Sequence, residues 1–190
     1  EIPLPQAKAI RLMNAAENTI KNHTARRKRR QITRLASISV DSSLVIKLYE
    51  KEGRELETAI NDLLQEPFLA LTCRHVTKQN EGEPDHLIYD SNENIFAVQT
   101  TARERKNISF RKATSVIGQS SKYNPVGYII FGRPDFQNLA IEDSVSQTKA
   151  GFNYKLIPIH VLAEMYVLFK EGALGSGDVG NILTNWTGYI

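Results

Sequence analysis

An aspartate and a glutamine, separated by a strand-turn-strand pattern, form the most chemically suggestive combination in this sequence. Pro84-Asp85 precedes the apolar run 87–89, a polar turn follows, and the apolar run 95–98 leads directly to Gln99. Two neighbouring strands of this kind bring such side chains toward one point. Metal-dependent hydrolysis of phosphodiesters needs hard oxygen ligands that converge in this way, with a lysine nearby to orient water or to stabilise phosphate charge. The pattern therefore favours a divalent-metal site.

Other residues complete this candidate site. Glu57 lies on an amphipathic helix, from which a carboxylate can reach a second metal or support the first. The position two residues after Gln99 is Thr101, so no lysine stands there. Lys106 and Lys112 follow on the segment expected to form the next helix, and they would contact the scissile or a flanking phosphate. The candidate catalytic residues are Asp85, Gln99, Lys106, Lys112 and Glu57, and the candidate metal ligands are Asp85, Gln99 and Glu57.

Positive charge is concentrated in one short segment, although the net charge of the chain is only +3. Such a cluster favours polyanions, while the end of a solvated helix can have the same composition. Two arginines that follow the Gln99 strand are expected to grip the nucleic-acid backbone as well. The candidate nucleic-acid-binding residues are Arg26, Arg27, Lys28, Arg29, Arg30, Arg103 and Arg105.

Length and composition place further bounds on the protein. The 190 residues are 41% hydrophobic, enough for one domain with a sizeable core. The single cysteine, Cys73, rules out an internal disulfide and is expected to be a buried apolar residue. We find no signal peptide and no run apolar enough for a bilayer, so we expect a cytoplasmic protein without a membrane partner.

Hydrophobic periodicity predicts the elements that would position these residues. We expect helices near 53–64, 107–117 and 160–170, strands near 68–76, 87–89, 95–98 and 126–131, an apolar run 156–159 before the last of these helices, and a short helix near 176–183. The run 44–48 fits either a strand or a short helix. Together these elements predict an α/β fold with a mixed central sheet flanked by helices. We assign residues 1–50 to an N-terminal helical and basic extension and residues 51–190 to the domain itself.

The order of the motifs resembles the PD-(D/E)xK nuclease superfamily, in particular Mrr-like and type II restriction endonucleases. The run from Gly53 to Ile60, which includes Glu57, is similar to the first helix of Mrr-like enzymes. Pro84-Asp85 is similar to their metal-binding aspartate, and Gln99 to the glutamine of their Gln-x-Lys motif. The resemblance covers about residues 53–170. It implies a restriction endonuclease-like fold and a Mg²⁺- or Mn²⁺-dependent endonuclease that acts on DNA in restriction or anti-phage defence, as a homodimer or within a larger defence complex.

The missing lysine leaves three interpretations open. Its role has moved to Lys106 or Lys112, as the viral cap-snatching endonucleases of the same fold suggest. Alternatively, Gln99 stands where a lysine belongs, because residues 100–105 resemble the Thr-Thr-x-Lys/Arg-acid-Arg run after the active-site lysine of some type II enzymes. The site would then be inactivated. In the third interpretation the domain keeps the nuclease fold only to bind nucleic acid or another protein.

Overall fold

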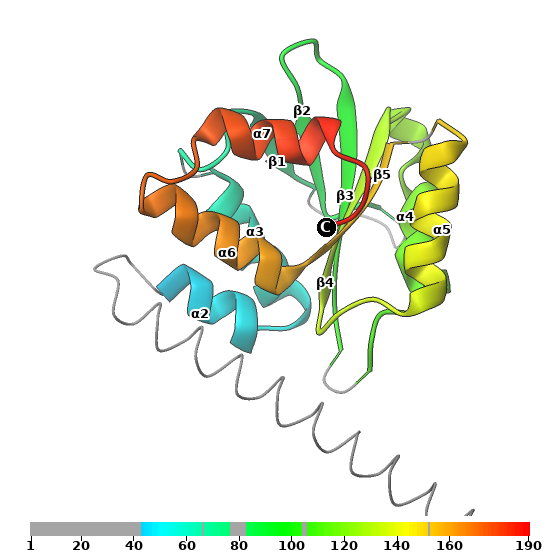
Figure 1. Ribbon diagram of the computed structural model, residues 1–190, viewed down its shortest axis with the longest axis horizontal. Coiled ribbons are helices and arrows are strands. Elements are labelled where there is room, and N and C mark those ends of the chain that lie inside the picture. Colours follow the sequence, from blue (N-terminus) through cyan, green and yellow to red (C-terminus); the bar gives the residue numbers. More distant parts are fainter. Residues whose placement is uncertain (1–42, 66, 77–82, 104–105, 152) are drawn as a thin grey trace, which may run out of the picture. The chain divides into compact units, whose positions relative to one another are not determined.

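A six-stranded mixed sheet organises the part of the chain that the structure describes (Figure 1). The order is β1-β2-β3-β4-β5-β6. The first three strands pair antiparallel, and β3 to β6 pair parallel. The strands are β1 (Thr72–His75), β2 (His86–Tyr89), β3 (Ile95–Ala102), β4 (Gly127–Arg133), β5 (Asn153–Pro158) and β6 (Gly188–Tyr189).

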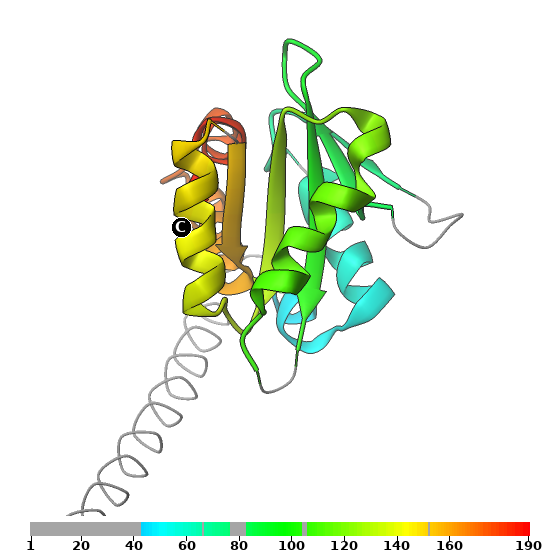
Figure 2. The same cartoon turned by 90° about the vertical axis from the view of Figure 1, so that its right-hand side faces the viewer.

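Helices cover both faces of the sheet (Figures 1 and 2). One layer, which we call the α4/α5 face, consists of α4 (Phe110–Gln119) and α5 (Asn138–Lys149). The α6/α7 face carries α2 (Ser43–Glu50), α3 (Gly53–Gln65), α6 (Ile159–Lys170) and α7 (Ser176–Asn185). A short 3-10 helix, Ser121–Tyr123, follows α4. This is the predicted α/β architecture of a mixed sheet between helical layers.

The computed structural model describes residues 43–190, apart from 66, 77–82, 104–105 and 152. The compact unit begins at Ser43. Residues 1–42 of the expected N-terminal extension, which include the basic cluster from Arg26 to Arg30, lie outside the described residues, whereas its last residues, 43–50, form helix α2 of the compact unit. Within the described ranges, no helix has the length and apolar character that crossing a bilayer requires.

The central strands are buried on both faces, which explains their apolar sequences. Alternate residues of a strand point to opposite faces. Ala97, Ile130 and Leu156 belong to the core beneath α4 and α5. Val98 and Ile129 alternate with them, so they point to the α6/α7 face, and both are fully buried. A sheet covered on both sides in this way holds the ends of its strands at fixed positions.

Most predicted elements are present, with shifts at their ends. The helix at 53–64 and the hairpin strands are confirmed, and the ambiguous run 44–48 is helix α2. The predicted strand 68–76 is wrong over its first half, because only Thr72–His75 pairs with β2. Phe68 instead packs edge-on against Tyr166 and Phe169, with ring centroids 5.5 and 5.6 Å away. The first half of this segment is therefore apolar because its side chains pack against α6, and not because it forms a strand.

Helix α5 was not predicted from the sequence. Its buried positions include only Ala140 and Ser144, while Leu139 and Val145 are exposed. A helix with so narrow an apolar stripe lacks the periodicity by which helices are recognised. Its place is determined by contacts with β5 and β6.

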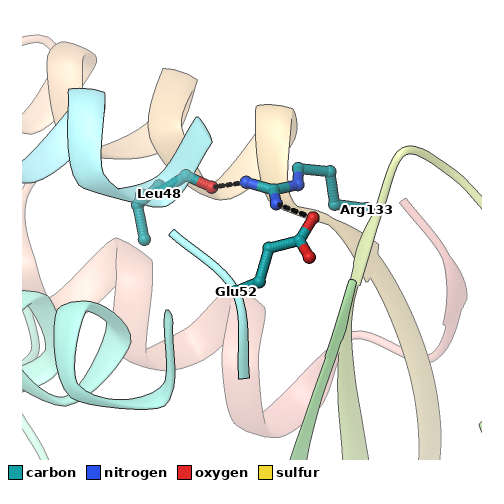
Figure 3. Close-up of polar contacts among 3 residues, drawn as sticks. All are labelled: Leu48, Glu52 and Arg133. Carbon is teal, nitrogen blue, oxygen red and sulfur yellow. Dashed lines mark hydrogen bonds and ion pairs between the residues drawn. The ribbon is translucent and has the colours of Figure 1, made fainter. Parts of the chain in front are cut away.

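An arginine at the carboxyl end of β4 ties the sheet to the turn between α2 and α3 (Figure 3). Nη1 of Arg133 donates a hydrogen bond to the carbonyl oxygen of Leu48 at 2.8 Å, and Nη2 lies 3.2 Å from Oε1 of Glu52. The Arg133 side chain is largely buried and Glu52 is half exposed. This link fixes the amino end of α3 beside the carboxyl ends of the central strands.

Candidate nuclease-like site

The β2–β3 hairpin places Asp85 across from Gln99. His86 pairs with Val98 in the antiparallel ladder, and the backbone N–H of Asp85 donates to the carbonyl oxygen of Val98 at 2.9 Å. The turn of the hairpin is held by Asp90, whose Oδ1 accepts the backbone N–H groups of Asn92 and Asn94. Asp85, just before β2, therefore lies opposite Gln99, which follows Val98 on β3.

The two side chains form a buried carboxylate–amide pair, which we call the Asp85–Gln99 pair. Nε2 of Gln99 donates to Oδ2 of Asp85 at 2.8 Å, and the backbone N–H of Thr100 donates to the same oxygen at 2.6 Å. Asp85 is 0% exposed and Gln99 is 6% exposed. Hydrogen bonds from two donors are what a buried carboxylate needs in place of water.

The pair lies on the α4/α5 face, near the carboxyl end of β3. Gln99 and Thr101 alternate with Thr100 along the strand, so both share the face of Ala97. Gly132 of β4 stands opposite Thr101. The ring of Phe136 covers Gly132 so closely that a Cβ there would lie 2.4 Å from the ring. The glycine is therefore required by the aromatic side chain that closes this end of the face.

His86 follows Asp85 but points to the opposite face, as the alternation predicts. It is fully buried, and its ring centroid lies 5.0 Å from that of His75 on β1. The expected burial of Cys73 is also found, and desolvation raises the pKa of its thiol to about 12. A thiol with so high a pKa remains protonated and is a poor nucleophile or metal ligand.

The pair offers two oxygen-bearing side chains to a cation such as Mg²⁺ or Mn²⁺. Mg²⁺ in proteins is typically held by one or two carboxylates, with water and substrate phosphates as its other ligands. The pair supplies one carboxylate, and the group facing that carboxylate is an NH₂ that donates to it. Within the described residues, no three carboxylate, imidazole or thiolate side chains gather as a metal site.

The remaining candidate residues lie on other elements or between them. Glu57 is half-buried on α3, which belongs to the α6/α7 layer. Arg103 and Lys106 precede α4, which begins only at Phe110, so the expectation that Lys106 lies on that helix is wrong. Lys112 is in the first turn of α4. All three cations are exposed, and Arg105 lies outside the described residues.

The sequence interpretation missed two kinds of residue. Gly132 and Phe136 pack against each other at the end of the α4/α5 face. Neither side chain has a catalytic or metal-binding group, so the sequence did not mark them as part of the site. Arg111 adds an exposed cation beside Lys112 at the start of α4. Its position next to Lys112 in the sequence was a sufficient signal for including it with the candidate nucleic-acid-binding residues.

Comparisons with known proteins give a structural match. No protein-family model matches the chain, and no curated protein matches it. Among solved structures, the chain is similar to the restriction endonuclease FokI, with a TM-score of 0.56 and 12% sequence identity. The match covers 80% of this chain and 31% of FokI, so the chain spans about a third of that protein. The fold of the described residues is restriction endonuclease-like.

Proposed function

We propose that this chain is a nucleic-acid-binding domain with a restriction endonuclease-like fold, whose Asp85–Gln99 pair stands in place of a working cleavage site. The observation that carries the proposal is the hydrogen bond from the Gln99 amide to the Asp85 carboxylate at 2.8 Å. An amide that donates to the candidate metal ligand is an arrangement for structure or binding. DNA is the proposed partner, because FokI is a restriction endonuclease.

The hydrogen bonds that Asp85 accepts from an amide and a backbone N–H support binding without hydrolysis. Phosphodiester cleavage develops negative charge that a lysine, an arginine or a metal ion must stabilise. Gln99 and Thr101 bring no charge to the strand. Lys106 and Lys112 are exposed on the segment after it, whereas the pair is buried.

Exposed cations on that segment supply a surface for phosphates. Arg103, Lys106, Arg111 and Lys112 lie between the end of β3 and the first turn of α4. Within the described part of the chain, these four side chains form no salt bridge. The first turn of α4 contains no acidic residue. Cations at a helix amino end oppose its dipole, but a bound phosphate interacts favourably with both.

A binding experiment tests this surface. Fluorescence anisotropy with labelled duplex DNA should show an affinity that falls steeply as the salt concentration rises. In a plot of the logarithm of the binding constant against the logarithm of the salt concentration, Lys112→Ala should make the slope less steep by about 0.9 if one phosphate contact is lost. Lys149→Ala is the matched control, because Lys149 is an exposed lysine at the opposite, carboxyl end of α5. Equal slopes for both variants would exclude the start of α4 as the binding surface.

A cleavage experiment tests the chemistry separately. Plasmid DNA and Mg²⁺ should give almost no cleavage with the unaltered protein. If Gln99 occupies a lysine position, Gln99→Lys should restore cleavage, whereas Thr101→Lys should do so if the lysine belongs two residues later. Mg²⁺-dependent cleavage by the unaltered protein at the rate of an ordinary nuclease would contradict the proposal.

A Mg²⁺-dependent endonuclease is the second candidate, favoured by the fold and by the position of Asp85 before β2. In that case Lys106 or Lys112 supplies the missing charge. Alanine at the responsible lysine should lower the cleavage rate by orders of magnitude while DNA binding falls only modestly. Restriction or anti-phage defence, with two copies cutting two strands, is the biological setting proposed for this activity.

A further inference from the structure

Phe110, the first residue of α4, is the most exposed phenylalanine in the described part of the chain. It is 37% exposed, whereas Phe96, Phe131 and Phe136 are at most 3% exposed. Ala113, three residues further on, is buried, so Phe110 lies at the margin of the face that α4 packs against the sheet. Within the described residues, no other aromatic ring and no cation lies against the Phe110 ring. The ring is therefore open to a ligand.

Basic side chains precede and follow this ring along the chain. Arg103 and Lys106 lie before Phe110, Arg111 and Lys112 directly after it, and all four are exposed. Side chains in the first turn of a helix lean toward its amino end, so Arg111 and Lys112 reach back toward the residues before α4. The described residues between 103 and 112 contain no acidic side chain. We call the four cations and the ring together the Phe110 surface.

The backbone before Phe110 is anchored to a neighbouring segment of the domain. The N–H of Ile108 donates to the carbonyl oxygen of Asp135 at 2.7 Å, and the N–H of Gln137 donates to the carbonyl oxygen of Ile108 at 2.9 Å. Ile108 is also fully buried. The start of α4 is therefore held in place before a ligand arrives, and binding loses little entropy in ordering it.

We propose that the Phe110 surface binds single-stranded DNA, with its cations on the phosphates and an unpaired base stacked on the Phe110 ring. A phenyl ring has no donor or acceptor with which to form hydrogen bonds to the edge of a base pair. Its flat face stacks instead on the π-face that every base carries. In a duplex those faces are covered by the neighbouring base pairs. The surface should therefore prefer single strands, which expose them.

This inference rests on the proposed function, because it names the form of nucleic acid that the same surface binds. Affinity for DNA of any form tests the proposed function. The ratio of the affinities for a single strand and for its duplex tests the inference, so the two can fail separately. Both quantities come from fluorescence anisotropy with a labelled oligothymidine strand, alone and paired with oligodeoxyadenosine. Oligothymidine is chosen because it does not pair with itself.

Variants at position 110 separate stacking from charge. The unaltered protein should bind the single strand about tenfold more tightly than the duplex. Phe110→Leu keeps an apolar side chain without a flat ring, so it should lower the single-strand affinity about tenfold and leave the duplex affinity nearly unchanged. Phe110→Tyr keeps the ring and should retain the preference. Lys112→Ala, which removes a phosphate contact, should weaken both complexes.

The single tryptophan of the chain allows a direct test of stacking. Trp186 is 58% exposed and follows α7, in the other helical layer. Phe110→Trp combined with Trp186→Phe moves the tryptophan to the proposed stacking position, where the single strand should quench its fluorescence. The fluorescence of Trp186 in the unaltered protein is the matched control and should change little when the same strand is added.

Two results would overturn the inference. One is a duplex bound by the unaltered protein as tightly as the single strand. The other is a single-strand affinity that Lys112→Ala lowers and Phe110→Leu does not, which would assign the ring to a contact other than a base. Binding of neither form would overturn the proposed function as well. If Phe110→Leu does not fold, the tryptophan at position 110 decides: quenching by the single strand supports the inference, and unchanged emission contradicts it.

Discussion

Two buried ionisable side chains, one acidic and one basic, lie on opposite faces of the sheet and are held by similar kinds of hydrogen bond. Asp85, on the α4/α5 face, is held by the Gln99 amide and a backbone N–H. Lys155 of β5, on the α6/α7 face, donates to the amide oxygen of Asn153 and to the carbonyl oxygen of Thr184 at 3.1 Å. In these contacts each side chain is hydrogen-bonded to an amide or backbone group.

The surroundings separate a structural cluster from a candidate site. The cluster of Lys155, Asn153 and Thr184 holds the last turn of α7, where a helix presents carbonyl oxygens and its negative dipole end. Asn153 also donates to the Thr184 carbonyl at 2.7 Å, and the Lys155 ammonium lies 5.0 Å from the Phe96 ring centroid. The Asp85–Gln99 pair instead lies at β3, and the segment of chain that follows β3 carries exposed basic side chains. A buried ionisable residue therefore indicates a functional site only when exposed groups that can bind a ligand lie near it.

The largest expected effect is on the anionic side. Asp85→Ala should destabilise the fold by about 3 kcal/mol, because it leaves the Gln99 amide and the Thr100 N–H buried without that acceptor. Asp85→Asn keeps an acceptor oxygen at the same place and should cost about 1 kcal/mol. Urea denaturation measures both. Equal losses for the two substitutions would mean that charge, and not the hydrogen bonds, stabilises the pair.

The cationic side should be visible in the pH dependence of stability. Burial lowers the pKa of Lys155 from 10.5 to about 7, so in the intervening range the unfolded chain binds a proton that the folded chain does not. Stability should therefore rise with pH through this window, by about 2 kcal/mol from pH ~7 to ~9. At higher pH the Cys73 thiol, with its pKa raised to about 12 by burial, adds the opposite trend.

Lys155→Met should remove this rise. Urea denaturation of the variant between pH ~7 and ~9 should give a nearly constant free energy of unfolding. Lys149→Met, at an exposed position of α5, should keep the rise of the unaltered protein. The same pH profile in both variants would show that Lys155 carries its ordinary charge in the folded state.

The smallest effect should come from the partly exposed contact of Arg133, which extends the comparison toward solvent. Arg133→Met leaves the Leu48 carbonyl without its donor and should cost about 1–2 kcal/mol. Glu52→Gln weakens only the ion pair to the half-exposed glutamate and should cost less than about 0.5 kcal/mol. If the denaturation curves of Arg133→Met and of the unaltered protein had the same midpoint, Arg133 would have no role in holding the turn between α2 and α3.

Local sequence patterns, such as hydrophobic periodicity and turn residues, predict much of the architecture. The stripe of Leu56, Ile60 and Leu63 specified α3, and the turn residues around Asp90 specified the hairpin. Helix α5 and the short β1 were missed or overextended, because contacts with other elements decided them. Chain order also suggested that Asp85 and Gln99 would lie close together.

The sequence by itself determined that this chain has an aspartate before one hairpin strand, a glutamine on the next, and no lysine two residues later. Only the tertiary structure decided that the amide donates to the carboxylate, that Phe136 closes the face over Gly132, and that Lys155 is buried on the other side. The physical reason is that a residue type fixes which groups can donate or accept. Burial and direction depend on packing between strands and helices that are distant in the chain.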